Sequence, residues 1–502
     1  MPHSSGHRSR RNIIRSAFTL RSEGLGQSVV RGAGLQFLGI ALRTLITIFS
    51  TAVLARLLTP ADFGYIAMAL VVTEFAALFG AFGFTNVLIQ RKVINRLQLD
   101  TVFWASLGIG TLLAGLVVAM SLFSGLIFAD SQVGPLLRVL AISFVINSLG
   151  AVPWVVLSRQ LMFRTEFYIQ VLPVVIRTVA AVAMAYAGMG VWSLVWGGIV
   201  GAVCGILISF ARVPFVPRWR FHMAFITSTW RISGGYFGNT ALYYISTNLD
   251  LLLLGRSLGA TSLGYYQNAR SLTDEIRARI AMPLQHVLFP AFSAVQTNRD
   301  RFQNMVMTAG RLLAAVVVPV GFGVSANATE LVLVLYGEQW RPMIPVMAMF
   351  GISAALRAAT AIGSPLFNAN NKVGLALRYN SIGTALLIGG VLLAMPYGIE
   401  AVAASVALTS LYSLVSFRAA FGLIGLGMRD VLNVLARPMV AATAMWLLTE
   451  AFRQWQLDLP VAGLLAIQVA LGAAVYTLTL HLLSRQYWLD FSQAVRLFGK
   501  KG

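Results

Sequence analysis

The chain alternates long apolar stretches with short polar connections from residue 34 almost to its C-terminus. A helix needs about 20 mostly apolar residues to cross the hydrocarbon core of a bilayer, so each stretch of that length predicts one membrane-spanning helix. The predicted spans are 34–57, 63–89, 100–122, 134–157, 166–187 and 190–211, then 233–254, 262–288, 306–325, 343–365, 375–395 and 399–422, and finally 434–451 and 461–483. This pattern predicts an all-α integral membrane protein with about 14 transmembrane helices, in two groups of six and a final pair.

The two groups of six spans match one another when the chain is shifted by 200 residues. Residues 31–65 and 231–265 are identical at 11 of 35 positions without a gap. Matches such as Arg56/Arg256 carry the most weight, because a shared apolar composition raises chance identity elsewhere. Six spans per copy give both copies the same orientation, which predicts two six-helix lobes related by an axis along the membrane normal. The predicted domains are a cytoplasmic basic tail over 1–30, an N-terminal lobe over 31–222, a C-terminal lobe over 223–430, and an extra helix pair with a cytoplasmic tail over 431–502.

Basic and acidic residues separate into alternate connections between the predicted spans. One set of connections holds Arg91, Lys92 and Arg96, Arg159 and Arg164, the arginines of 212–231, Arg299 and Arg301, Lys372, Arg418, Arg429 and Arg437, and then Arg485, Arg496, Lys500 and Lys501. The other set holds mainly Asp62, Asp130, Glu330, Glu338, Glu400, Glu450 and Asp458, with Arg256, Arg341 and Arg453 as exceptions. Because Lys and Arg are retained on the cytoplasmic side during membrane insertion, this pattern predicts that both termini are cytoplasmic.

Composition supports the membrane class and limits the partners. Hydrophobic residues make up 58% of the chain and charged residues 11%, which is more apolar than a soluble domain of this length requires. Basic cytoplasmic loops account for most of the net charge of +21, so we expect no nucleic-acid partner and expect the basic tail to contact membrane lipids. The single cysteine, Cys204, excludes an intramolecular disulfide and any cysteine-rich metal site.

The sequence contains no phosphate-binding loop, no zinc-protease motif and no nucleophile elbow. We therefore expect a transporter and not an enzyme, without a cofactor or a bound metal. Transport without ATP hydrolysis requires another driving force, for which H⁺ or Na⁺ is the expected coupling ion.

Ionisable residues inside the predicted spans are candidates for function, because a charge at bilayer depth costs several kcal/mol unless it meets water or a partner. At about 1.5 Å per residue, Arg43, Glu74, Arg177, Asp274 and Arg357 lie near mid-depth, and Asp250 lies toward the outer side of its span. The span 262–288 is the most polar. Its residues Gln267, Arg270, Asp274 and Arg277 share one helical face, which predicts a cavity-lining helix with Arg270 and Asp274 as an i, i+4 pair.

Arginines outnumber acids among these intramembrane residues, and arginine makes bidentate contacts to phosphate. We therefore expect a central cationic cavity for an anionic, phosphate-bearing cargo. The expected substrate-binding residues are Arg43, Arg177, Arg270, Arg277, Arg357 and Gln267, and the expected ion-coupling or charge-pairing residues are Glu74, Asp250 and Asp274. A purely structural interpretation stays open, in which the acids pair with Arg43 and Arg270 and the other arginines bind carbonyl groups at helix C-termini.

Four stretches of the chain resemble the bacterial Wzx-type oligosaccharide flippases, a polysaccharide transporter family within the superfamily that includes the MATE exporters and MurJ. They are LARLLTPADFGYIAMAL (54–70), NLDLLLLGRSLGATSLGYYQNARSL (248–272), LFPAFSAVQTNRDRF (288–302) and LYGEQW (335–340). The resemblance implies a two-lobed fold of 12 core helices with two more at the C-terminus, in the bacterial inner membrane.

The cargo implied by the resemblance is an oligosaccharide linked to undecaprenyl diphosphate. It would be flipped from the cytoplasmic to the periplasmic leaflet by alternating access, for the synthesis of exopolysaccharide, capsule or O-antigen. A polysaccharide polymerase and glycosyltransferases are the implied protein partners.

Two other classes of protein fit parts of the sequence. An ion-coupled multidrug/cation antiporter of the same superfamily would carry acids and aromatic residues in its cavity, which the surplus of intramembrane arginine disfavours. A membrane glycosyltransferase or polysaccharide polymerase would need a large external loop, whereas the predicted external connections are short.

Overall fold

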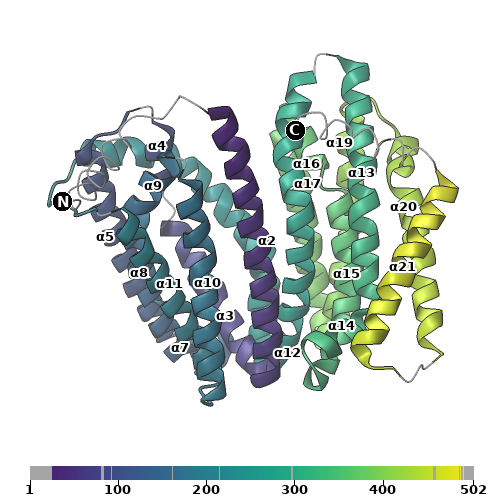
Figure 1. The fold of residues 1–502 in the computed structure, drawn as a ribbon, viewed down its shortest axis with the longest axis horizontal. Helices are drawn as coiled ribbons and strands as arrows, with labels where there is room; N and C mark the ends of the chain where they lie inside the picture. The colour runs from purple at the N-terminus through teal and green to yellow at the C-terminus, as the bar shows by residue number, and fades with distance from the viewer. Residues whose placement is uncertain are drawn as a thin grey trace, which may run out of the picture. The chain divides into compact units, whose positions relative to one another are not determined.

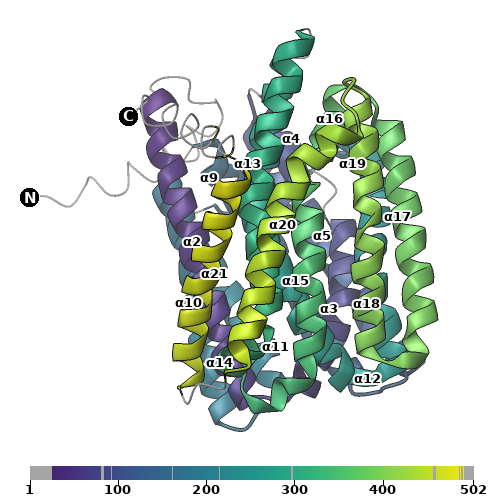
Figure 2. The same ribbon diagram turned by 90° about the vertical axis from the view of Figure 1, so that its right-hand side faces the viewer.

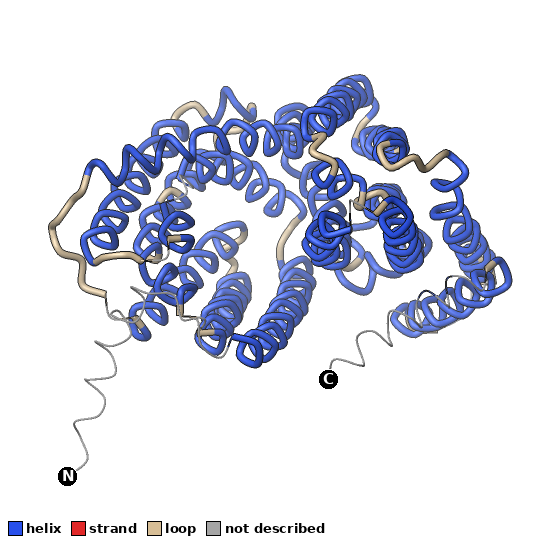
Figure 3. Tube along the Cα trace, turned by 90° about the horizontal axis from the view of Figure 1, so that it is seen from above, coloured by secondary structure: helices blue, strands red, loops and turns tan. Residues whose placement is uncertain are grey.

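The computed structural model describes residues 25–80, 84–91, 93–160, 162–213, 215–295, 298–455 and 459–484, together with Tyr487 and Asp490. Within these residues every regular element is a helix, which confirms the predicted all-α class (Figure 3). Outside them lie residues 1–24 of the predicted basic tail and the predicted loop charges Lys92, Asp458, Arg485, Arg496, Lys500 and Lys501.

The chain divides into two compact units, residues 1–261 and 262–502. The helices of the first unit are α2 (Leu25–Leu57), α3 (Pro60–Gly80), α4 (Phe84–Gln90), α5 (Arg96–Ser121), α6 (Ser124–Phe128), α7 (Val133–Leu140), α8 (Ile142–Leu149), α9 (Ala151–Arg159), α10 (Phe163–Tyr186) and α11 (Val191–Arg212). Helix α12 (Met223–Val295) belongs to both units. The second unit continues with α13 (Arg299–Ala326), α14 (Ala328–Leu335), η1 (Glu338–Met343), α15 (Ile344–Ala359), α16 (Gly363–Ala369), α17 (Val373–Ala394), η2 (Met395–Tyr397), α18 (Ile399–Ser410), α19 (Tyr412–Gly422), α20 (Met428–Arg453) and α21 (Val461–Leu483).

Membrane crossing is encoded in the length and apolarity of these helices. Eleven helical stretches of the described chain are long and apolar enough to span a bilayer, and the bent pair formed by Val133–Leu149 and Ala151–Arg159 would make a twelfth. Some of these helices begin at local capping signals. At α3, for example, Pro60 occupies the first turn while Thr59 and Asp62 cap each other's backbone N–H groups.

Small residues let the helices of the first unit approach closely. Helices α10 and α11 run side by side (Figure 1), and Gly197, Gly201 and Gly205 recur every fourth residue along their contact. A methyl group at Gly201 would lie only 2.8 Å from Cβ of Arg177 and 2.9 Å from the carbonyl oxygen of Pro173. This small-residue stripe is the packing that membrane helices use where lipid gives no hydrophobic drive for association.

Helix α13 is the centre of the second unit, where it packs against α15 and α20 (Figure 2). Its buried residues, among them Val306, Gly310, Leu313 and Val317, repeat at three- and four-residue intervals, which is the period of one helix face. The crossing with α15 is close because glycines meet there: a methyl group on Gly321 would lie 2.5 Å from a backbone oxygen of α15.

Two of the predicted spans are broken helices. The span that starts with α7 bends by 41° at Gly150, and the span made of η1, α15 and α16 is interrupted between Ala359 and Gly363. Each break precedes a proline, Pro153 in α9 and Pro365 in α16, which lacks the N–H that would bond back to the residue four positions earlier. The breaks therefore follow from the sequence.

Helix α12 consists of two helical limbs that meet at Gly259. The φ of Gly259 is 77° and its ψ is 176°, a conformation that side chains disfavour. Immediately after this turn the backbone of Ala260 passes so close to α3 that a methyl group on Gly64 would lie 1.8 Å from the Ala260 carbonyl oxygen. Gly64 is thus required for α3 to pack against the turn.

We predict that Gly64→Ala lowers the apparent melting temperature of the purified protein markedly, because overpacking against a backbone carbonyl costs about 1–3 kcal/mol or more. Gly108→Ala in α5 is the matched control, since a methyl group there meets no atom within 4 Å. Thermal unfolding in detergent measures both variants. Equal melting temperatures for Gly64→Ala and Gly108→Ala would contradict the packing described.

Candidate functional site

The second limb of α12 carries the predicted polar face. Nε of Arg270 lies 3.5 Å from Oδ2 of Asp274, which forms the predicted i, i+4 pair, and the two side chains are 18% and 31% exposed. The buried side of the same limb is formed by Leu263, Tyr266 and Ala269, and the ring of Tyr266 packs edge-on against an aromatic ring of α15. Arg270 follows Leu263 by seven residues and Tyr266 by four, so the pair lies close to this buried side and is only partly exposed.

Gln267 lies one turn before this pair. Its Nε2 donates a hydrogen bond to Oγ of Ser271 at 3.1 Å, while its Oε1 is buried and accepts no hydrogen bond from the described residues. Arg277 follows on the same limb, but its side chain lies outside the described part of the structure. The described polar face thus consists of Gln267, Arg270 and Asp274.

In the first unit, Glu74 lies at the exposed surface of α3 beside Tyr244 of α12. The Tyr244 hydroxyl is 3.3 Å from Oε2 of Glu74 and 3.0 Å from the carbonyl oxygen of Val71. No sequence pattern points to Tyr244, because 170 residues separate it from Glu74. Asp250, six residues further along the same limb, is 7% exposed and therefore buried.

The remaining predicted arginines are at least partly exposed on helices that cross the membrane. Arg43 is half-buried in the middle of α2, and Arg177 is exposed in the middle of α10, opposite Gly201 of α11. Arg357 is exposed in the last turn of α15, directly before the break in that span. The hydroxyl of Thr360 closes this turn by donating to the carbonyl oxygen of Leu356 at 2.9 Å.

The predicted site residues therefore fall into two groups. Arg43, Glu74, Arg177 and Asp250 belong to the first unit, whereas Gln267, Arg270, Asp274, Arg277 and Arg357 belong to the second. Within the second group the structure brings Arg270 and Asp274 into contact. All the acids and arginines of the expected site lie on helices that form, or were predicted to form, membrane spans.

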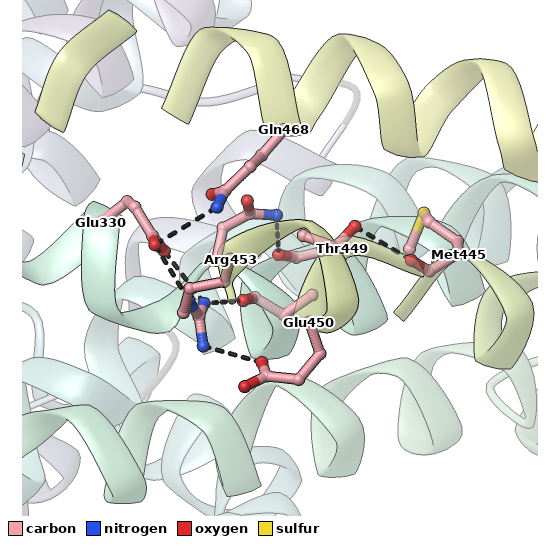
Figure 4. Close-up of polar contacts among 9 residues, drawn as sticks. Glu330, Met445, Thr449, Glu450, Arg453 and Gln468 are labelled. Atoms are coloured by element: carbon pink, nitrogen blue, oxygen red, sulfur yellow. Dashed lines mark hydrogen bonds and ion pairs between the residues drawn. The ribbon is translucent and has the colours of Figure 1, made fainter. Parts of the chain in front are cut away.

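The structure also contains a charged cluster that sequence analysis treated only as loop charges (Figure 4). Arg453 at the end of α20 contacts both carboxylate oxygens of Glu330 on α14, at 3.0 and 3.1 Å, and its Nη1 donates to Glu450 at 2.7 Å. Gln468 of α21 donates to the same Glu330 at 3.4 Å. Glu330 and Gln468 are buried, so this cluster joins α21 and the end of α20 to α14.

A second ion pair joins the described end of the chain to α13. Nε of Arg311 lies 2.6 Å from Oδ2 of Asp490, and both side chains are largely buried. The Tyr487 hydroxyl, near the same end, donates to the carbonyl oxygen of Asn433 on α20 at 2.9 Å. Arg311 lies inside the predicted span 306–325. A basic residue at that depth needs a partner, so its position in the sequence already indicated a buried ion pair.

The three arginines that departed from the predicted loop pattern all have partners. Arg453 pairs with Glu330 and Glu450, Arg341 pairs with Glu338, and Arg256 donates to the carbonyl oxygens of Leu126 and Ile127. Local pairing explains why basic residues are tolerated among the acidic connections.

The length and apolarity of the helices define a polytopic membrane protein. Residues 53–345 match the family model described as polysaccharide biosynthesis protein, and the chain belongs to that family. The predicted resemblance to the Wzx-type polysaccharide family is thereby confirmed.

Two curated relatives have informative names. The succinoglycan biosynthesis transport protein ExoT of Rhizobium meliloti (strain 1021) is 28% identical over 305 residues, which cover 61% of this chain and 62% of ExoT. The match thus spans less than two thirds of the length of ExoT. The lipopolysaccharide biosynthesis protein WzxC of Escherichia coli (strain K12) is 26% identical over 350 residues, which cover 68% of this chain and 70% of WzxC.

Solved structures show which fold the chain adopts. The lipid II flippase MurJ in its inward closed conformation matches with a TM-score of 0.71 and 13% identity, over 91% of this chain and 99% of MurJ. An inward-facing multidrug resistance MATE family transporter of the MOP superfamily matches with a TM-score of 0.59 and 14% identity, over 78% of this chain and 95% of that protein. The chain therefore has the MurJ/MATE-like fold.

We predict that Glu330→Gln destabilises the protein by about 3 kcal/mol, because it leaves the guanidinium of Arg453 without its bidentate partner in a largely buried setting. Glu338→Gln is the matched control, since the Glu338–Arg341 pair is exposed and such pairs contribute at most about 1 kcal/mol. Thermal unfolding of the purified variants compares the two. An equal effect of both substitutions would refute a stabilising role for the buried cluster.

Proposed function

We propose that this protein flips an oligosaccharide linked to undecaprenyl diphosphate from the cytoplasmic to the periplasmic leaflet of the bacterial inner membrane, by alternating access. The product would serve the synthesis of exopolysaccharide, capsule or O-antigen. The observation that carries the proposal is that Arg43 is half-buried and Arg177 exposed on membrane-crossing helices of a member of the polysaccharide biosynthesis family. A guanidinium at that depth requires water or an anionic ligand.

The relatives support the choice of cargo. ExoT is named as a succinoglycan transport protein and WzxC as a lipopolysaccharide biosynthesis protein, so a saccharide cargo agrees with both names. The fold shared with a lipid II flippase is compatible with a cargo that carries a lipid anchor. A diphosphate joins the two parts of such a cargo, and arginine is the side chain that matches phosphate best.

We propose a complete topology of 14 spans. Adding the bent helix pair and the two limbs of α12 to the eleven spanning helices gives this number. The spans would form two six-helix lobes of the same orientation, over 31–222 and 223–430, followed by the helix pair and tail over 431–502. Both termini, including the basic tail over 1–30, would be cytoplasmic, because the basic connections would then face the cytoplasm.

In this proposal each unit contributes cationic residues that recognise the cargo. Arg43, Arg177, Arg270, Arg277, Arg357 and Gln267 would bind the cargo. Asp274 would act as a positioning residue, because it contacts Nε of Arg270 and thereby orients the guanidinium.

The acids Glu74, Asp250 and Asp274 are the proposed sites for a coupling ion, H⁺ or Na⁺, and no cofactor is proposed. The protein would act as a transporter and not as an enzyme. Its partners would be the lipid-linked oligosaccharide, membrane lipids, and the polymerase and glycosyltransferases that handle the same cargo, with no role for nucleic acid.

An ion-coupled multidrug/cation antiporter is the second candidate function, and the match to a MATE family transporter favours it. The exposed arginines favour the flippase, because a cationic drug would be repelled by them.

We predict that Arg270→Ala and Asp274→Ala each reduce polysaccharide export at least ten-fold, since the first removes a phosphate-binding group and the second removes its support. Arg429→Ala, an exposed arginine at the start of α20, is the control for loss of a positive charge. Export is measured in cells that carry each variant as the sole copy, alongside the amount of membrane-inserted protein. Normal export by both variants at normal protein levels would refute the cavity assignment.

Glu74 can be tested separately as an ion-coupling group. We predict that Glu74→Gln, which removes the charge but keeps the shape, abolishes the dependence of transport on pH or on Na⁺. Tyr244→Phe removes only the hydroxyl next to Glu74 and should shift this dependence less. Transport assays across pH and Na⁺ concentration measure both variants. An ion dependence that is unchanged in Glu74→Gln would assign this carboxylate to structure alone.

A further inference from the structure

The connection between α11 and α12 is a well-anchored loop, residues 215–223, which we call the basic-aromatic loop. Its backbone is fixed to α5 by side-chain hydrogen bonds. The indole Nε1 of Trp104 donates to the carbonyl oxygen of Arg218 at 2.9 Å, and the backbone N–H of Arg218 donates to Oδ1 of Asp100 at 3.2 Å. Asp100 is completely buried, so it holds the loop from inside the unit.

Two further contacts fix the ends of the loop. The backbone N–H of His222 donates to the hydroxyl of Thr101 at 3.0 Å. At the other end, the guanidinium of Arg96 lies 4.6 Å from the ring centre of Phe215, a cation–π contact. Because the loop is held at several points, its backbone has a defined conformation. Its outward-facing side chains therefore form a defined surface.

That surface alternates large apolar side chains with basic ones. The exposed apolar residues are Val216 (72%), Trp219 (84%), Phe221 (55%) and Met223 (62%), and the exposed basic residues between them are Arg218, Arg220 and His222. Soluble surfaces rarely present so many large apolar side chains together. In a membrane protein, aromatic residues and arginine are enriched at the level of the lipid headgroups, where the apolar part meets acyl chains and the polar part meets water and phosphate.

The position of the loop agrees with that level. Helix α11 is a candidate span that ends at Arg212, so the loop begins within a few residues of the point where the chain leaves the hydrocarbon core. Helix α5, which also contacts the loop, is a candidate span that begins at Arg96. The Arg96 side chain donates to the carbonyl oxygen of Val216, so the start of this span also lies beside the loop.

The charge of the loop is not balanced by acids in the surrounding sequence. No Asp or Glu occurs between residues 205 and 249, and the neighbouring acid on α5, Asp100, is buried. Arg91 adds positive charge beside the loop, where its guanidinium lies over Phe225, whereas Arg96 pairs with Asp100 at 3.4 Å. The complementary ligand is an anion at headgroup depth.

We propose that the basic-aromatic loop binds the phosphate headgroups of anionic phospholipids in the leaflet that it faces. Arg218 and Arg220 contact the phosphates, and Trp219 and Phe221 insert among the first acyl carbons. The apolar side chains favour lipid over a soluble acidic protein as the ligand, because an acidic surface would leave them uncovered. Lipid bound here fixes the depth of the start of α12.

The proposal is tested by the lipids that surround the loop in liposomes. A single cysteine is placed by Val216→Cys in a Cys204→Ser background and labelled with a fluorophore. The protein is then reconstituted with increasing amounts of either brominated phosphatidylglycerol or brominated phosphatidylcholine, whose bromine atoms quench the label on contact. Each basic residue near an anionic lipid strengthens binding roughly five-fold. With Arg218 and Arg220 both in contact, we therefore expect half-maximal quenching at a roughly 25-fold lower fraction of phosphatidylglycerol than of phosphatidylcholine.

Charge-reversal variants identify the residues responsible. Arg218→Glu combined with Arg220→Glu should make the two lipids quench equally, whereas Arg429→Glu combined with Lys372→Glu, an equal charge change at exposed sites of the other unit, should leave the preference intact. Equal quenching by both lipids in the protein without charge reversals would overturn the proposal. Absence of quenching by either lipid would also overturn it, because the loop would then face water or another protein.

Discussion

The cost of placing a charge in hydrocarbon is the constraint on which the rest of this structure depends. Arg311, inside a predicted span, meets it by reaching the carboxylate of Asp490 on a distant part of the chain. At helix ends, Arg453 pairs with Glu330, and Arg159 donates to three backbone carbonyl oxygens near the end of α4. Arg177 is exposed at a helix surface within a candidate span. A charge at that depth requires water or a polar partner, which is why the account of function rests on such residues.

Close packing of helices and closed helix ends hold the backbone in place at the intramembrane arginines. Gly201 brings the backbone of α11 against Arg177, so the base of that side chain is held in place. Arg357 is placed comparably by a helix end, because Thr360 closes the last turn of α15 before the span breaks. Rigid backbones that carry partly open charged groups are what a transporter needs if whole units move while the binding groups keep their local geometry.

The sequence predicted what depends on neighbouring residues and missed what depends on distant ones. Apolar length predicted the helical membrane class, and i, i+4 spacing predicted the Arg270–Asp274 pair. The Glu330–Arg453 pair joins residues 123 positions apart, and Tyr244 meets Glu74 across 170 positions. No periodicity encodes such contacts, because they arise only when separate helices pack. Arg453 departs from the charge pattern of the connections, and this departure was the one sign in the sequence of its contact with Glu330.

Translocation of a fluorescent oligosaccharide linked to undecaprenyl diphosphate, by the purified protein in liposomes, tests the central claim most directly. The account predicts protein-dependent movement of the labelled lipid between leaflets, with no comparable exchange of cationic drugs. Drug or cation exchange without movement of any diphosphate-linked saccharide would contradict it and would favour the antiporter.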